Sequence, residues 1–128
     1  MKPAHFSGRA TRFKGNGRKL GYPTANLSYE TDLADGVYFG LADLKSYKKH
    51  PALIFIGVPT TLGDKQRRAE VYLLDIPDVD YYDENLSVSV LHFHRGNKKF
   101  SNLGDLVEAM HDDEKNSRIW FKSKDLLS

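Results

Sequence analysis

Four short apolar or alternating segments recur along the chain, each bounded by glycine, proline or asparagine. Runs of this length and punctuation are typical of β-strands joined by turns. One later segment has a helical period instead. Because strands with exposed edges pair wrongly, a small mainly β chain is expected to close its sheet into an antiparallel barrel. The predicted strands lie at 37–42, 52–56, 69–76 and 86–94.

The helical period begins after residue 100. Asn102 is a plausible N-cap, and Asp105 suits the first turn of a helix. The pattern predicts an amphipathic helix that runs to about Arg118, with residues 119–121 packing back on the body. Its apolar positions, spaced i, i+3, i+4 and i+7, are Leu103, Leu106, Val107 and Met110.

Alternation in the last predicted strand places two histidines, His92 and His94, on one face. A zinc site would need further ligands, and no third ligand has a recognisable spacing. Ordinary surface or barrel-lining histidines are therefore the favoured reading. The residues predicted to share that face are Leu86, Val88, Val90, His92 and His94.

The amino-acid composition limits the classes of protein to which the chain can belong. The 128 residues are 40% apolar and include no cysteine, which excludes a disulfide framework, a thiolate metal site and a cysteine nucleophile. No segment approaches the roughly 20 apolar residues that span a bilayer, and the start lacks the apolar run of a secretory signal. We expect one domain over residues 1–128, cytoplasmic and monomeric, with no membrane partner.

Charge is unevenly distributed along the chain. No acidic residue precedes Glu30, although the net charge is only +2. This segregation suggests that the N-terminal segment meets an anion such as a nucleotide, a nucleic acid or a membrane surface. A simple basic tail explains it equally well. The basic residues of the segment are Lys2, Arg9, Arg12, Lys14, Arg18 and Lys19.

A glycine-rich basic loop lies within this segment. Gly15 and Gly17 would let backbone N–H groups face a phosphate, and Arg18 and Lys19 would supply positive charge. The spacing fits neither a Walker A sequence nor a dinucleotide fingerprint. A glycine-rich hairpin turn is the simpler reading of this pattern alone.

Two oxygen-bearing side chains follow the loop. Thr24 and Asn26 are two residues apart, so in an extended segment they point the same way. A hydroxyl and an amide oxygen are hard ligands that suit Mg²⁺. The alternative is a turn held by side-chain to backbone hydrogen bonds.

One carboxylate stands inside an apolar predicted strand. Glu70 needs a reason to be there, because an unpaired buried charge is costly. It could serve as a general base, or it could face solvent or pair with Arg67 or Arg68.

Residues 17–27, Gly-Arg-Lys-Leu-Gly-Tyr-Pro-Thr-Ala-Asn-Leu, resemble the signature of the riboflavin kinase family, which occurs alone or fused to an FMN adenylyltransferase. Four further matches follow in the same order, and together they span about residues 8–118. They lie at 36–38, at 56–60, at 70–75, and at Arg95 with Lys99, Phe100 and the helix bearing Asp113.

The resemblance implies a six-stranded antiparallel Greek-key barrel with one C-terminal α-helix. It implies a riboflavin kinase that transfers the γ-phosphate of ATP to the ribityl 5′-hydroxyl of riboflavin, giving FMN and ADP, with Mg²⁺ as cofactor. Glu70 matches the general base. The implied ligands are Gly15, Gly17, Arg18, Lys19 and Thr24 for the nucleotide, Thr24 and Asn26 for the metal, and Arg95, Asn97 and Phe100 for the flavin.

The chain departs from the family pattern in its loops. Phe13 stands where the family has glycine, Asn16 where it has arginine, and Asn97 where it usually has glutamate. Tyr81-Tyr82-Asp83 replaces Leu-Tyr-Gly, and the mid-chain turn is one residue shorter. The alternatives are a non-catalytic flavin- or nucleotide-binding relative and, less favoured, a nucleic-acid-binding barrel.

Overall fold

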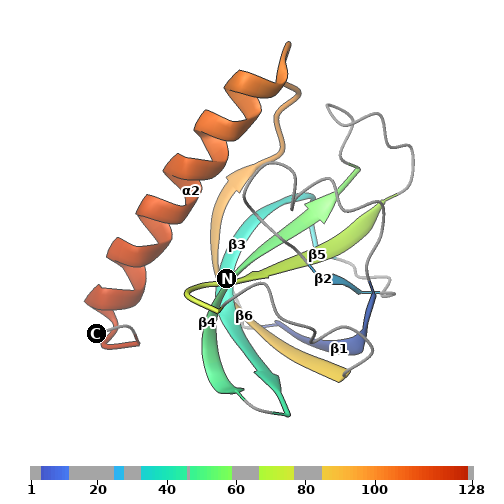
Figure 1. Ribbon diagram of the computed structural model, residues 1–128, viewed down its shortest axis with the longest axis vertical. Helices are drawn as coiled ribbons and strands as arrows, with labels where there is room; N and C mark the ends of the chain where they lie inside the picture. The colour runs from blue at the N-terminus through green and yellow to red at the C-terminus, as the bar shows by residue number, and fades with distance from the viewer. Residues whose placement is uncertain are drawn as a thin grey trace.

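The computed structural model describes residues 4–11, 25–27, 33–45, 47–58, 67–76 and 85–126, the backbone alone at 11, 25 and 26. These residues form a curled sheet with one long helix beside it (Figure 1). The elements are β1 (Ala4–Thr11), β2 (Ala25–Leu27), β3 (Gly36–Leu44), β4 (Tyr47–Gly57), β5 (Arg68–Leu73), β6 (Asn85–Gly96) and α2 (Leu103–Ser123).

All the strand pairs are antiparallel. The strand order is β1-β2-β5-β4-β3-β6, and pairing of β6 with β1 closes the sheet into a barrel. The prediction of a mainly β fold with antiparallel strands and one C-terminal helix is confirmed. Each of the four predicted strands coincides with one of β3 to β6. Strands β1 and β2 were not predicted, although β1 alternates small or apolar residues with polar ones; β2 has only three residues.

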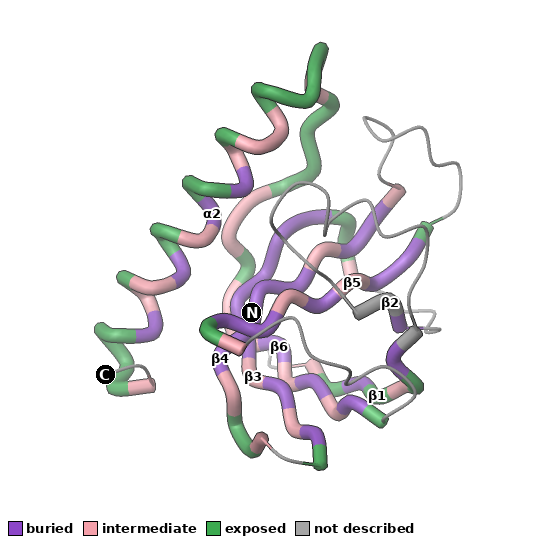
Figure 2. Tube along the Cα trace, in the orientation of Figure 1, coloured by how far each residue is buried: buried purple, intermediate pink, exposed green. Residues whose placement is uncertain are grey.

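The barrel interior is an apolar core. Alternate residues of β5 point inward, so Ala69, Val71 and Leu73 are buried while Glu70 and Tyr72 between them are only partly buried. Figure 2 shows this alternation of buried and less buried positions along the strands. The largest fully buried inner side chains include Tyr38, Leu27, Ile54, Ile56 and Leu86.

A second apolar cluster lies between the outer face of the sheet and α2. Phe121 is fully buried there, and the helix therefore continues past the predicted end at Arg118 to Ser123. Trp120 packs partly buried against the same cluster, whereas Ile119 is 59% exposed. The other buried members are Val37, Phe39, Leu53 and Leu74.

Two irregularities in β6 overturn the predicted face. Gly40 pairs with Val90 but Phe39 pairs with His92, so Leu91 is an extra residue, and a second shift follows at His94. A bulge of this kind reverses which side chains face the core. Leu86, Val88 and Val90 do point into the core, but His92 and His94 stack on the outward-facing Phe39. The prediction of one shared face is therefore wrong beyond Val90.

The helix begins as predicted. The Asn102 side chain accepts a hydrogen bond from the Asp105 N–H at 2.8 Å, which satisfies one of the free donors of the first turn. Within the described residues no helix combines the length and apolar character needed to cross a bilayer.

Candidate functional site

One row of directly paired residues crosses five strands of the sheet. Asn26 of β2 is opposite Glu70 of β5, and Glu70 is opposite Phe55 of β4. The row continues through Val37 of β3 to Arg95 of β6. Residues opposite one another across an antiparallel pair share a face, and Val37 belongs to the cluster on the outer face. The row therefore lies outside the barrel, on the side where α2 packs.

Glu70 is on this outer face, half-buried between Ala69 and Val71, which both point into the core. Its neighbour on β4 is Phe55, and its neighbour two residues along β5 is Tyr72. Both aromatic side chains pack partly buried against the outer cluster. The carboxylate position thus adjoins apolar surface on the side of β4 and faces Asn26 on the side of β2.

The pairing of Asn26 with Glu70 brings together two positions predicted for the site. For Asn26 the structure describes the backbone, and it lies one strand spacing from Glu70, about 4.8 Å. The other predicted nucleotide and metal ligands lie outside the described residues: Gly15, Gly17, Arg18, Lys19 and Thr24. Phe13, Asn16 and the Tyr81-Tyr82-Asp83 segment also lie outside them.

Arg95, predicted as a flavin ligand, bonds to the helix. Its Nε and a terminal nitrogen donate to the two carboxylate oxygens of Asp113, each at 2.7 Å. The Asp113 side chain is only 2% exposed, and a bidentate guanidinium–carboxylate pair is the geometry that best compensates such a buried charge. Arg95 also donates to the Gly96 carbonyl. Its visible contacts fix the end of β6 to the middle of α2.

Asn97, also predicted as a flavin ligand, bonds to the barrel. Its side-chain amide donates to the Ile56 carbonyl of β4 at 2.9 Å. This contact lies where β3 begins, because Gly36 pairs with both Ile56 and Gly96. Asn97 is itself exposed, so its amide sits at the rim of the barrel and not in its core.

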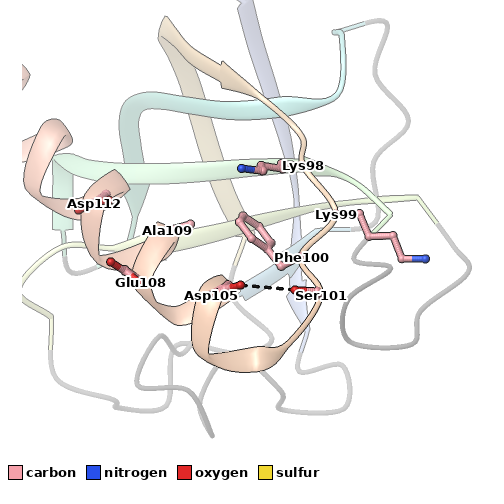
Figure 3. A pocket seen from close by; sticks show the side chains of 8 residues that line it. All are labelled: Lys98, Lys99, Phe100, Ser101, Asp105, Glu108, Ala109 and Asp112. Atoms are coloured by element: carbon pink, nitrogen blue, oxygen red, sulfur yellow. Dashed lines mark hydrogen bonds between the residues drawn. The ribbon is translucent and has the colours of Figure 1, made fainter.

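Phe100, the third predicted flavin residue, lines a pocket between the loop after β6 and the start of α2. The pocket has a volume of about 450 Å³. Figure 3 shows the Phe100 ring between the loop and the helix, with Lys99 pointing away from the helix. The lining residues are Lys98, Lys99, Phe100, Ser101, Asp105, Glu108, Ala109 and Asp112.

Sequence reasoning missed the acidic wall of this pocket. Asp105, Glu108 and Asp112 line it from the first turns of α2, and their spacing of three and four residues is the signal that could have placed them on one helix face. Asp105 is further held by donors from Ser101 and Asn102. The pocket thus offers one aromatic ring, two lysines and several carboxylates.

The residues around Trp120 have a structural role. Trp120 stacks on His92 with centroids 5.2 Å apart, and His94 stacks on Phe39 at 4.7 Å. Burial lowers the pKa of His94, although the nearby Asp113 carboxylate opposes that shift. Among the described residues no group of three or more His, Cys, Asp or Glu side chains could hold a metal ion.

A second ion cluster joins the helix to the loop after β5. Arg118 donates to both carboxylate oxygens of Asp75 and to Glu114. The Arg118 hydrogen bond lowers the pKa of Asp75, and burial together with the Glu114 charge raises the pKa of Tyr72. Two ion pairs therefore attach the helix to the barrel, one between Asp113 and Arg95 and one between Arg118 and Asp75.

Comparison with known proteins decides the family. The family model described as flavokinase, riboflavin kinase, matches residues 1–121. The chain belongs to the riboflavin kinase family. The resemblance seen in the signature at 17–27 is thereby confirmed, and with it the assignment to a family of enzymes.

Individual relatives of the chain support this family assignment. The chain is 29% identical over 98% of its length to a trifunctional protein RibF/MnmA of Mycoplasmoides gallisepticum, of which it covers 19%. It is 29% identical over 87% of its length to the riboflavin kinase of Homo sapiens, covering 76% of that protein.

A solved structure shows the same fold. The crystal structure of riboflavin kinase from Trypanosoma brucei superposes with a TM-score of 0.73 at 20% identity, covering 98% of this chain and 84% of that one. The chain thus spans nearly a whole riboflavin kinase in one relative and about a fifth of a multifunctional protein in another.

Proposed function

We propose that the chain is a riboflavin kinase, which transfers the γ-phosphate of ATP to the ribityl 5′-hydroxyl of riboflavin and releases FMN and ADP. The observation that carries the proposal is the pairing of Asn26 with Glu70 on the outer face of the barrel, in a chain of the riboflavin kinase family. That pairing joins the end of the family signature to the strand that bears the candidate base. In the same proposal the sheet is the six-stranded Greek-key barrel of this family, one domain over residues 1–128 that acts as a monomer in the cytoplasm.

Glu70 supplies the acid–base chemistry in this proposal. A primary alcohol attacks a phosphoryl group more readily when a carboxylate takes its proton as the new O–P bond forms. The bond from phosphorus to the β,γ-bridging oxygen of ATP breaks at the same time, and ADP leaves. Glu70 is half-buried beside Phe55, so a bound polyol would meet the carboxylate with little competing water.

The donor side uses hard oxygen ligands and backbone N–H groups. The Asn26 amide oxygen and the Thr24 hydroxyl suit Mg²⁺, which prefers oxygen ligands and keeps several waters. When bound, Mg²⁺ would neutralise charge on the β- and γ-phosphates. Gly15, Gly17, Arg18 and Lys19 would hold the phosphates through N–H groups and positive charge.

The pocket beside Phe100 suits the flavin side of the substrate. A flat ring system with polar edges can stack on an aromatic side chain and exchange hydrogen bonds with lysines and carboxylates. Lys98 and Phe100 from the loop and Glu108 from α2 provide these groups. Arg95 and Asn97 then act behind this pocket, because their side chains bond to Asp113 and Ile56.

The test is a product assay. Purified protein is incubated with riboflavin and Mg-ATP, and the flavins are separated by chromatography. The proposal predicts FMN formation that needs both ATP and Mg²⁺. Riboflavin binding without FMN over a wide range of protein concentration would favour the non-catalytic relative, for which the substituted loop positions Phe13 and Asn16 are the argument.

A further inference from the structure

Among the described residues, the side chain of Asn97 attaches the loop after β6 to the barrel. The Asn97 amide reaches across the start of β3 and donates to the Ile56 carbonyl at 2.9 Å. Three residues later, Phe100 lines the pocket, and Lys98, Lys99 and Ser101 line it with Phe100. The hydrogen bond from Asn97 to Ile56 therefore fixes the start of the loop segment, residues 98–101, that lines the pocket opposite α2.

The backbone of β4 is shaped to receive this amide. Gly57 follows Ile56 with φ +145°, a conformation that side chains strongly disfavour. A Cβ on Gly57 would also collide with the Asn97 amide. Glycine at this position thus tolerates the backbone conformation and leaves room for the Asn97 amide.

The acceptor lies next to the strand pair of the candidate site. Phe55, which precedes Ile56, is the direct partner of Glu70. Ile56 is the partner of Ala69, and Gly57 of Arg68. A bond from Asn97 to Ile56 therefore connects the pocket wall to the two strands that set the position of Glu70.

We infer that Asn97 is a positioning residue that latches the pocket loop, residues 97–101, to β4 and so holds the wall of the flavin pocket in the position that binds riboflavin. The inference rests on the proposed function for its kinetic part alone. The contact needs an amide, because a carboxylate has no N–H to donate to a carbonyl.

Two substitutions separate a latch from a ligand contact. Asn97→Asp keeps the size but replaces the donor by an acceptor, and Asn97→Ala removes the side chain. Asp43→Ala is the matched control, since Asp43 accepts a backbone hydrogen bond from Lys49 N–H at 2.7 Å in the β3–β4 turn, on residues that do not line the pocket.

The first measurement is hydrogen exchange of the ligand-free protein, which requires no activity. We expect amides of residues 98–101 and 56–58 to exchange faster in both Asn97 variants and to be unchanged in Asp43→Ala. Unchanged exchange in the Asn97 variants would overturn the latch. A uniform increase over the whole barrel would overturn it as well, because that pattern means general destabilisation.

The second measurement is steady-state kinetics with riboflavin. We expect KM for riboflavin to rise about two- to tenfold, the range that corresponds to one net hydrogen bond, with kcat kept. Asn97→Gln, which retains the amide, should recover part of the loss. A fall in kcat at constant KM would contradict the inference. Wild-type protein that makes no FMN would refute the proposed function, and the exchange data would still decide the latch.

Discussion

Asn26 and Glu70 stand directly opposite each other in the antiparallel pair of β2 and β5. Their row continues through Phe55 and Val37 to Arg95, where a buried ion pair with Asp113 attaches the helix. The candidate base and the helix anchor therefore sit on one face of the barrel, three strand spacings or roughly 14 Å apart. The candidate general base thus lies near one end of the row, and the ion pair that attaches the helix lies at the other end.

The ion pair between Arg95 and Asp113 should contribute strongly to the stability of the fold. Arg95→Met leaves the Asp113 carboxylate, 2% exposed, without its bidentate partner. We expect a loss of about 3–5 kcal/mol in the free energy of unfolding, as for other buried pairs broken on one side. Urea denaturation followed by circular dichroism measures it.

Two further variants control that measurement. The double variant Arg95→Met with Asp113→Leu should recover most of the loss, since no buried charge is left unpaired. Asp75→Asn weakens the exposed pair with Arg118 and should cost at most about 1 kcal/mol. A loss for Arg95→Met no larger than that for Asp75→Asn would show that the Asp113 pair does not anchor the helix.

Packing of the helix on the sheet depends on its last turns. Phe121 is fully buried against Phe39, with ring centroids 6.0 Å apart, and Phe121→Ala should cost about 3–5 kcal/mol. Ile119 on the neighbouring surface is 59% exposed, so Ile119→Ala should change stability by no more than about 0.5 kcal/mol. Equal losses in thermal or urea unfolding would mean that the helix end is not packed as described.

Stability should fall on mild acidification because of His94. Burial lowers its pKa in the folded protein relative to about 6.5 in the unfolded chain. The neutral ring is therefore favoured by folding, and the contribution is complete above pH 6.5 and is lost as the pH falls below it. Asp75, whose pKa is also lowered, affects stability in a more acidic range.

Proton NMR titration of the His94 ring between pH 8 and 5 checks this prediction. The expected result is a midpoint below 6.5, with the free energy of unfolding decreasing over the same interval. His94→Gln should flatten that pH dependence. A midpoint at or above 6.5 would mean that the Asp113 charge outweighs burial at this ring.

Local sequence patterns predicted β3 to β6 and the start of α2, because strand alternation and helix capping depend on residues that are close in the sequence. The N-cap Asn102 is an example. The prediction that His92 and His94 share one face of β6 with Val90 was wrong. The bulges in β6 arise from its pairing with β3, and no local sequence pattern reveals that pairing. The helix end was wrong because Phe121 is buried by tertiary contacts.

The site was predicted unevenly for the same reason. Glu70 was singled out as a charge within an apolar strand, and Asn26 as an oxygen ligand in an extended segment; their pairing across β2 and β5 needed the fold. Arg95 and Asn97 remain predicted flavin ligands, and their protein partners, Asp113 and Ile56, became known only with the fold. A side chain that holds a site and one that touches a ligand look alike in a sequence.

The most direct test of the account is turnover by Glu70→Gln, measured beside riboflavin binding by fluorescence quenching. Glu114→Gln, which neutralises a carboxylate bound to Arg118, is the control and should keep the wild-type rate. The account predicts that Glu70→Gln binds riboflavin as the wild type does and forms FMN about 10²- to 10⁴-fold more slowly. FMN formation by Glu70→Gln at the wild-type rate would contradict it.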